Sequence, residues 1–211
     1  MANHNIILIA GKATTGKSTS LMGLHDQEGV MYLNCESNKE LPFPHKFQSY
    51  TITDPMQVLE AFDYAETDPK IHTIALDSLT FLMDMFESTY IQGAVDTRSA
   101  WGEYAQFYNM LTQQKMANST KRIVVIAHTA DVVNEVENVR EVRVKLKGSI
   151  MNKGVEASFT TVLATKKVDL EKLSAYKNPL LLPEGEGYTE DYGYRHVFQT
   201  NPTKDTVNEH I

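Results

Sequence analysis

Residues 11–18 read Gly-Lys-Ala-Thr-Thr-Gly-Lys-Ser and match the pattern G-x-x-x-x-G-K-[S/T] without departure. The loop follows a wholly apolar run at residues 6–10, which is typical of a strand buried on both faces of a sheet. We expect the next segment, residues 17–26, to be helical. Strand, glycine-containing loop and helix form the context that a phosphate-binding loop requires. The sequence therefore predicts a nucleotide site here, with ATP and Mg²⁺ as the expected ligands.

Each part of this loop has a chemical role in holding phosphate. Gly11 and Gly16 permit backbone angles that other residues resist, so that successive N–H groups can point at phosphate oxygens. We expect Lys17 to reach the β- and γ-phosphates and the Ser18 hydroxyl to bind Mg²⁺. The alternative is a chance match in an ordinary turn. The predicted nucleotide-binding residues are Gly11, Lys12, Ala13, Thr14, Thr15, Gly16, Lys17, Ser18 and Thr19.

Apolar runs alternate with helical segments along the rest of the chain. A capping box at Asp54 and Gln57 marks the start of one of these helices. Such alternation predicts a single α/β domain over residues 1–211, with a mainly parallel central sheet flanked by helices. The expected core strands cover residues 6–10, 30–35, 71–76, 122–127 and 158–168, with shorter strands at 47–52 and 192–199 and an irregular insertion at 170–191.

Three polar residues, Glu36, Asp77 and His128, each follow a separate expected strand. Active-site residues of parallel sheets gather at the carboxyl ends of strands. Asp77 is the candidate Mg²⁺ ligand, although an aspartate before a helix can also act as a cap. Glu36 is the candidate for orienting an attacking water, the alternative being a solvated loop residue. His128 is either a sensor of the γ-phosphate or a hydrogen-bonded histidine at a strand end.

Basic and apolar residues alternate from Val142 to Lys147, as in a half-exposed strand. With an expected turn at residues 137–138, this pattern predicts a basic hairpin over residues 131–153. A row of lysines and arginines on one strand face can meet a nucleic-acid backbone, although neighbouring glutamates also fit a solvated hairpin. The candidate nucleic-acid contacts are Arg140, Arg143, Lys145, Lys147 and Lys153, of which Arg143, Lys145 and Lys147 are expected to share one face.

Composition narrows the class of protein. The 211-residue chain has a formal net charge of −7, so any nucleic-acid contact has to be local. One cysteine, Cys35, excludes an internal disulfide and a cysteine-built zinc site. The apolar runs are too short to cross a bilayer, and the first residues do not resemble a secretory signal. We therefore expect a cytoplasmic protein without a membrane partner.

The order of these motifs resembles the RecA-like ATPase core. The motifs are GKATTGKS, a strand ending in glutamate (VMYLNCES), a strand ending in Asp-Ser (IALDSLTF) and a strand ending IVVIAHTAD. More narrowly, residues 5–200 look like the small phage-encoded RecA-like ATPases of single-strand annealing and recombination, sometimes grouped with the Sak proteins. With core strands numbered along the chain, this resemblance implies the sheet order 5-1-4-3-2 and a mobile DNA-binding loop after the fourth.

The resemblance also implies roles and partners. Lys17 and Ser18 would bind phosphate and Mg²⁺, and Asp77 would also bind the metal. Glu36 would activate the attacking water, and His128 would occupy the position of the γ-phosphate sensor. The protein would be an ATPase that binds single-stranded DNA as a ring or filament of identical subunits and assists phage recombination or annealing in a host cell. A single-strand binding protein or another recombination protein would be a further partner, and Lys147 or Lys153 would complete a neighbour's ATP site.

Two other function classes stay open at this point. A small-molecule (nucleotide) kinase also begins with a phosphate-binding loop, and residues 131–153 are basic enough to form its lid. A nucleotide-gated loader or scaffold without DNA affinity would use slow hydrolysis to time the release of a partner.

Overall fold

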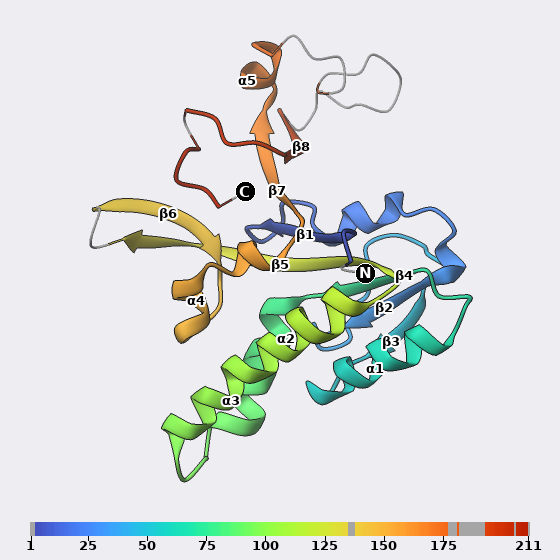
Figure 1. Cartoon of the computed structure of the whole chain (residues 1–211). Helices are drawn as coiled ribbons and strands as arrows, with labels where there is room; N and C mark the ends of the chain where they lie inside the picture. Colours follow the sequence, from blue (N-terminus) through green and yellow to red (C-terminus); the bar gives the residue numbers. More distant parts are fainter. Residues whose placement is uncertain (1–2, 135–137, 177–180, 182–192, 205, 211) are drawn as a thin grey trace.

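A single mixed sheet organises the computed structural model, which describes residues 3–134, 138–176, 181, 193–204 and 206–210. The strands of the described chain follow the order β3-β2-β4-β5-β1-β7-β8, with β6 paired to β5 (Figure 1). Their bounds are Ile6–Gly11 (β1), Val30–Asn34 (β2), Gln48–Thr51 (β3), Thr73–Asp77 (β4), Arg122–Asn134 (β5), Val139–Val144 (β6), Thr161–Asp169 (β7) and Tyr194–Gln199 (β8).

The parallel register of this sheet brings the strand-end residues together. The predicted core strands are β1, β2, β4, β5 and β7, and their order confirms 5-1-4-3-2. All pairings among them are parallel, whereas β8 runs antiparallel to β7. Gly11 lies opposite His128 and Asn34 lies opposite Asp77 in the register. One edge of the sheet therefore carries the glycine-containing loop and the three predicted polar residues.

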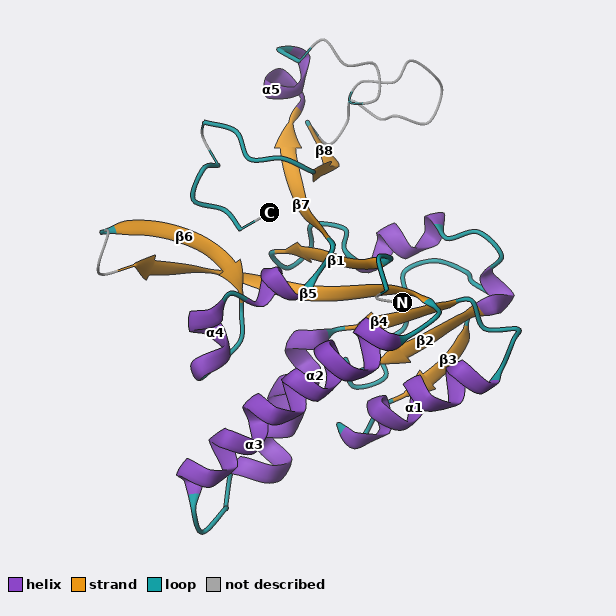
Figure 2. Ribbon diagram, viewed as in Figure 1, coloured by secondary structure: helices purple, strands orange, loops and turns teal. Residues whose placement is uncertain are grey.

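Helices cover one face of the sheet and a short helix with its following loop covers the other (Figure 2). Aromatic side chains of α2 and α3, among them Phe86, Tyr104 and Phe107, are buried in the larger core. The smaller core, on the opposite face, includes Leu21 and Phe43. The helices are α1 (Met56–Thr67), α2 (Leu79–Phe86), α3 (Thr97–Asn109), α4 (Ser149–Lys153) and α5 (Leu170–Ser174), and π-helical turns Glu87–Ile91 and Met110–Met116 continue α2 and α3.

The helix after the glycine-containing loop is shorter than the sequence predicts. In place of a helix over residues 17–26, a 3-10 helix spans Ser18–Gly23. Leu21 is its one buried side chain among the described residues, so little packing energy supports a longer helix. The amide of Ser20 divides its hydrogen bond between the carbonyls of Gly16 (3.0 Å) and Lys17 (3.2 Å), a pattern common at helix ends.

The predicted hairpin is present, and its first strand is the continuation of a strand of the central sheet. β5 itself continues to Asn134 and pairs with β6 in antiparallel register from Thr129–Val144 to Asn134–Val139, forming a ribbon that projects from the body (Figure 1). Residue 137 of the expected turn lies outside the described residues, as do residues 177–180 and 182–191 of the expected insertion and residue 192 of the expected last strand.

The predicted row of Arg143, Lys145 and Lys147 on one strand face is wrong. β6 ends at Val144, because the chain turns directly after it, where the amide of Leu146 donates to the carbonyl of Val144 at 3.0 Å. The two lysines therefore lie beyond the strand.

The C-terminal segment covers part of the outer edge of β6. The amide of Val142 donates to the carbonyl of Asn208 (3.0 Å), and its carbonyl accepts from the amide of His210 (3.1 Å). Glu209 is ion-paired to Lys166 of β7 at 2.5 Å. The ribbon is thus tied to β7 through the last described residues.

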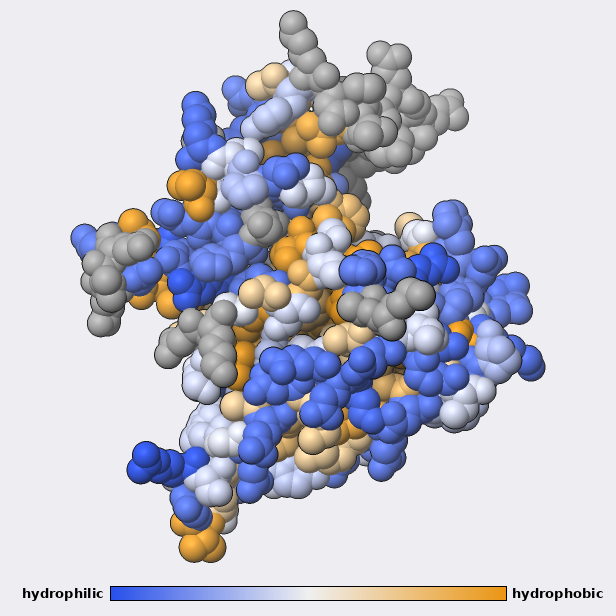
Figure 3. All heavy atoms as spheres, in the orientation of Figure 1, coloured by the Kyte–Doolittle hydropathy of each residue, from blue (hydrophilic) through white to orange (hydrophobic). Residues whose placement is uncertain are grey.

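Polar side chains dominate the face in Figure 3, and an apolar group marks the tip of the α2–α3 hairpin, where Val95 is fully exposed. In the portion of the chain that the structure describes, no helix is sufficiently long and apolar to pass through a bilayer.

Asp96 caps α3, the helix that packs with α2 beneath β4 and β5. Its Oδ1 accepts hydrogen bonds from the amides of Arg98 (3.0 Å) and Ser99 (3.1 Å). We expect Asp96→Ala to lower the free energy of unfolding by about 1 kcal/mol because those amides lose their partner. Urea titration followed by circular dichroism measures this. Asp96→Asn, which preserves the cap, should lose only a few tenths of a kcal/mol; equal losses would contradict the capping role.

Candidate active site

A cavity of about 290 Å³ opens at the carboxyl edge of the sheet, between the glycine-containing loop and the ends of β2, β4 and β5. All five residues predicted to act on phosphate, metal or water line it, although they come from four separate segments of the chain. These residues are Lys17, Ser18, Glu36, Asp77 and His128.

The loop adopts a conformation that depends on its two glycines for different reasons. Gly16 has φ +93° and Thr14 has φ +63°, the left-handed region in which glycine is favoured. Gly11 has no such angle in the structure. It is required by space instead, because a Cβ at Gly11 would collide with the side chain of Thr165 on β7. The expectation that both glycines serve unusual backbone angles is therefore corrected for Gly11.

Lys17 points into the cavity and is 5% exposed. Its Nζ donates to the carbonyl of Lys12 within the same loop at 2.8 Å. Burial lowers the pKa of Lys17, while the nearby carboxylates of Glu36 and Asp77 oppose that effect. A phosphate placed in the loop would give this ammonium a stronger, charged partner than the carbonyl.

Asp77 supplies an observation that fits a metal. The residue is 2% exposed, its Oδ2 accepts from the hydroxyl of Tyr32 at 3.1 Å, and its Oδ1 is buried without a hydrogen-bond partner. Burial raises the pKa of Asp77, and the neighbouring hydroxyls of Ser18 and Tyr32 work against that rise. A buried oxygen with no partner is costly unless a cation or donor completes it.

The donor set suits Mg²⁺ together with nucleotide phosphates. Among the described residues, no cluster of three or more His, Cys, Asp or Glu side chains could hold a metal by itself. Mg²⁺ commonly uses one or two carboxylates, waters and substrate phosphates. Ser18 and Asp77 fit that arrangement.

Glu36 is held in a defined position at the end of β2. Its Oε1 lies 3.1 Å from Nε2 of His128 and accepts a hydrogen bond from the Ser78 hydroxyl at 3.2 Å. The His128 hydrogen bond is the main reason why the pKa of Glu36 lies below its usual value, against the effect of burial. Glu36 is therefore an anchored carboxylate, and the solvated-loop alternative does not describe it.

His128 joins this carboxylate to two other elements. The amide of His128 donates to the hydroxyl of Thr80 on α2 at 2.9 Å. The carbonyl of His128 accepts a hydrogen bond from the amide of Lys145 at 2.8 Å. The ring also meets the edge of Phe81, which is 40% exposed, at 5.6 Å between centroids. A displacement of His128 would therefore also displace Thr80 of α2 and Lys145 in the segment after β6.

A second cavity, of about 400 Å³, adjoins the first. The two share Thr14, Gly16 and Thr19, and the second is closed by His196 and Phe198 of β8. A ligand that occupied the phosphate loop could thus continue past Thr19 toward β8.

Two of the five predicted basic contacts, Arg143 and Lys147, are already paired inside the chain. Arg143 contacts the carboxylate of Glu141 and donates to His210 at 3.2 Å, and Lys147 contacts Glu87 at 2.5 Å. Arg140 and Lys145 are exposed. The side chain of Lys153 lies outside what the structure describes.

Sequence reasoning missed Tyr32, Ser78 and Lys39. Tyr32 occupies an apolar strand pattern and looks like core, and only the register against β4 places its hydroxyl beside Asp77. Ser78 directly follows Asp77, so its position next to a predicted site residue could have identified it from the sequence. Lys39 sits in a polar loop and carries no motif.

Comparison with known proteins supports one family. A family model described as an AAA domain matches residues 3–207, nearly the whole chain. A search of curated proteins returned no match.

Tyr32 offers a direct test of the metal geometry. We expect Tyr32→Phe to weaken Mg²⁺ binding about tenfold, because it removes the bond that orients the Asp77 carboxylate. The affinity for Mg²⁺ is measured by calorimetric titration of magnesium into the protein in the presence of nucleotide. Tyr50→Phe, at an exposed tyrosine of β3, is the control. If both variants bind Mg²⁺ equally well, Tyr32 does not position the carboxylate.

Proposed function

The chain belongs to the AAA domain family of nucleotide-hydrolysing ATPases, and from this we propose that it hydrolyses ATP by attack of a water that Glu36 orients. The observation that carries the proposal is the anchoring of Glu36 in the cavity that also holds Lys17, Ser18 and Asp77. Kinases transfer phosphate to an acceptor and exclude water, whereas an anchored carboxylate beside the phosphate site favours hydrolysis.

The two oxygens of Glu36 have separate tasks in this mechanism. Oε1 is occupied by His128 and Ser78, so Oε2 is the atom that can accept a hydrogen bond from water. Because the pKa of Glu36 is lowered, the carboxylate is ionised at neutral pH and orients the water. The water oxygen bonds to the γ-phosphorus as the bridging bond to ADP breaks, and its proton leaves toward Glu36 or the released phosphate.

The other cavity residues stabilise charge on the phosphates. Lys17 exchanges its bond to the Lys12 carbonyl for the β- and γ-phosphates, and the loop amides surround them. Ser18 and Asp77 would hold Mg²⁺, which when bound supplies further positive charge to the phosphates. The nucleoside would extend past Thr19 into the second cavity, against His196.

A variant at Glu36 tests the hydrolytic role. We expect Glu36→Gln to bind ATP with near wild-type affinity and to lower turnover about 100-fold, since the amide cannot accept the proton. Phosphate release and nucleotide binding are measured on the same preparation. Lys17→Ala should instead abolish turnover. Wild-type turnover in Glu36→Gln would contradict the role of this residue, and phosphate transfer to a nucleoside monophosphate in preference to water would favour a kinase.

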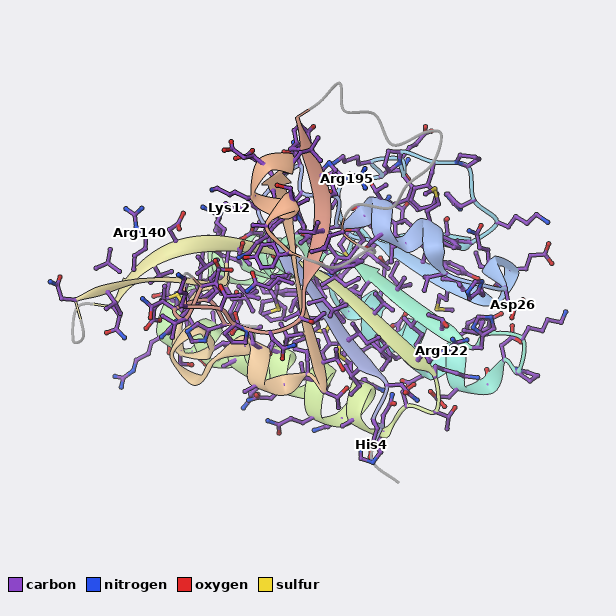
Figure 4. All side chains as sticks on the ribbon, turned by 90° about the horizontal axis from the view of Figure 1, so that it is seen from above. His4, Lys12, Asp26, Arg122, Arg140 and Arg195 are labelled. Carbon is purple, nitrogen blue, oxygen red and sulfur yellow. The ribbon has the colours of Figure 1, made fainter. Side chains whose placement is uncertain are left out.

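The ribbon of β5 and β6 supports a nucleic-acid partner as the second part of the proposal. Arg140 lies on the projecting ribbon (Figure 4), and Lys145 is exposed where the chain returns to the body. The amide of Lys145 is bonded to the carbonyl of His128, so the basic segment is joined to the strand end that contacts Glu36. ATP binding can therefore alter the position of Lys145.

Single-stranded DNA is the partner that this arrangement and the motif order favour. In the proposal, the protein works as a ring or filament in recombination or annealing, like the phage proteins that it resembles, together with another recombination protein. The pairing of Arg143 and Lys147 with carboxylates limits the charge available, so binding depends on few cations. Few phosphate contacts give a shallow dependence on salt.

DNA stimulation is the corresponding measurement. We expect single-stranded DNA to raise ATP turnover and Lys145→Ala to reduce that increase, because a phosphate contact is lost. Lys70→Ala, at an exposed lysine near the opposite edge of the sheet, is the matched control. Turnover that no nucleic acid changes would remove the DNA part of the proposal and leave the ATPase intact. Nucleotide-dependent assembly without DNA affinity would favour a loader or scaffold.

A further inference from the structure

A tight turn after β2 brings a second lysine to the active-site cavity. The buried side chain of Asn34 accepts a hydrogen bond from the amide of Glu36 and donates to the carbonyl of Lys39, both at 2.9 Å. The amide of Lys39 donates to the carbonyl of Glu36 at 3.0 Å. One amide side chain therefore fixes the distance between Glu36 and Lys39.

The two residues inside this turn are also held. Ser37 and Asn38 have φ of +52° and +60°, a conformation that non-glycine residues adopt infrequently. The Thr51 hydroxyl of β3 donates to Oδ1 of Asn38 at 2.7 Å. The turn is thus anchored to the neighbouring strand as well as to β2.

Lys39 is positioned over the cavity but bound weakly. Its Nζ lies 3.5 Å from Oε2 of Glu36, and its side chain is 74% exposed. Exposed ion pairs of this kind contribute little free energy, so Lys39 can exchange this partner for a better one. Oε2 is also the oxygen that the proposed reaction needs for water.

The cavity has an excess of negative charge, which a further cation would offset when ATP binds. Its lining includes three carboxylates, those of Glu36, Glu40 and Asp77, against two lysines, Lys17 and Lys39. ATP adds several negative charges to this acidic site, and the terminal phosphate carries much of that charge. Lys17 and a Mg²⁺ held by Ser18 and Asp77 do not balance these phosphates and the three carboxylates together.

From this geometry we infer that Lys39 binds the γ-phosphate of ATP and in doing so releases Oε2 of Glu36 for the attacking water. The inference rests on the proposed function of the cavity as an ATP site. With ADP there is no γ-phosphate, and Lys39 stays on Glu36. The lysine thereby makes the availability of the water-orienting oxygen depend on an intact triphosphate.

The experiment compares ATP and ADP on the full chain. We expect Lys39→Ala to weaken ATP binding about tenfold, the loss of one charged hydrogen bond, and to change ADP binding less than twofold. Turnover should fall about tenfold at saturating ATP, and Lys39→Arg should recover most of it. Lys46→Ala is the matched control, because Lys46 is also 74% exposed and also pairs with a glutamate, Glu28, at 3.2 Å.

Several results would overturn the inference. Equal losses of ATP and ADP affinity would show that Lys39 does not recognise the γ-phosphate. Faster turnover in Lys39→Ala would show that this lysine merely restrains Glu36. If the wild type hydrolyses ATP and Lys39→Ala matches Lys46→Ala, this inference fails and the proposed function stands. A wild type that does not bind ATP at all would remove both.

Discussion

The buried carboxylate of Asp77 and the buried ammonium of Lys17 line the same cavity, and the rest of the site is arranged around these two charges. Removing a carboxylate from water is costly, and burial raises the pKa of Asp77 accordingly. The hydrogen bond from the Tyr32 hydroxyl offsets part of that cost, yet Oδ1 keeps no partner in the described structure. In the proposed function, a nucleotide and its Mg²⁺ would complete this site.

One strand connects this site to the ribbon. β5 pairs with Asp77 of β4 through Ile126, presents His128 to Glu36 two residues later, and then continues to Asn134 in the ribbon. A continuous strand transmits a displacement along its length more directly than two elements joined by a loop. This continuity joins the proposed nucleotide site to the ribbon by one strand, which the motif order alone does not reveal.

Features that depend on a few neighbouring residues could be predicted from the sequence. The glycine-containing loop, the capping box at Asp54 and the three strand-end residues follow from patterns within a few positions, and the sheet order followed from the resemblance. The 3-10 helix at Ser18–Gly23 was missed because its length depends on packing against the sheet. Pairing of Lys147 with Glu87 was invisible for a similar reason, since the two lie 60 positions apart in the chain. Likewise, no pattern shows that Asn34 holds Lys39 over the cavity, because a buried asparagine at a strand end looks like any polar terminus.

The C-terminal segment that pairs with Val142 has a consequence for behaviour in concentrated solution. A projecting two-stranded ribbon exposes backbone donors and acceptors on its outer edge, where identical molecules can stack strand against strand. Asn208 and His210 occupy that edge at Val142, and the Glu209–Lys166 ion pair holds them there. The C-terminal segment thus removes the backbone groups of Val142 from strand-to-strand association between molecules.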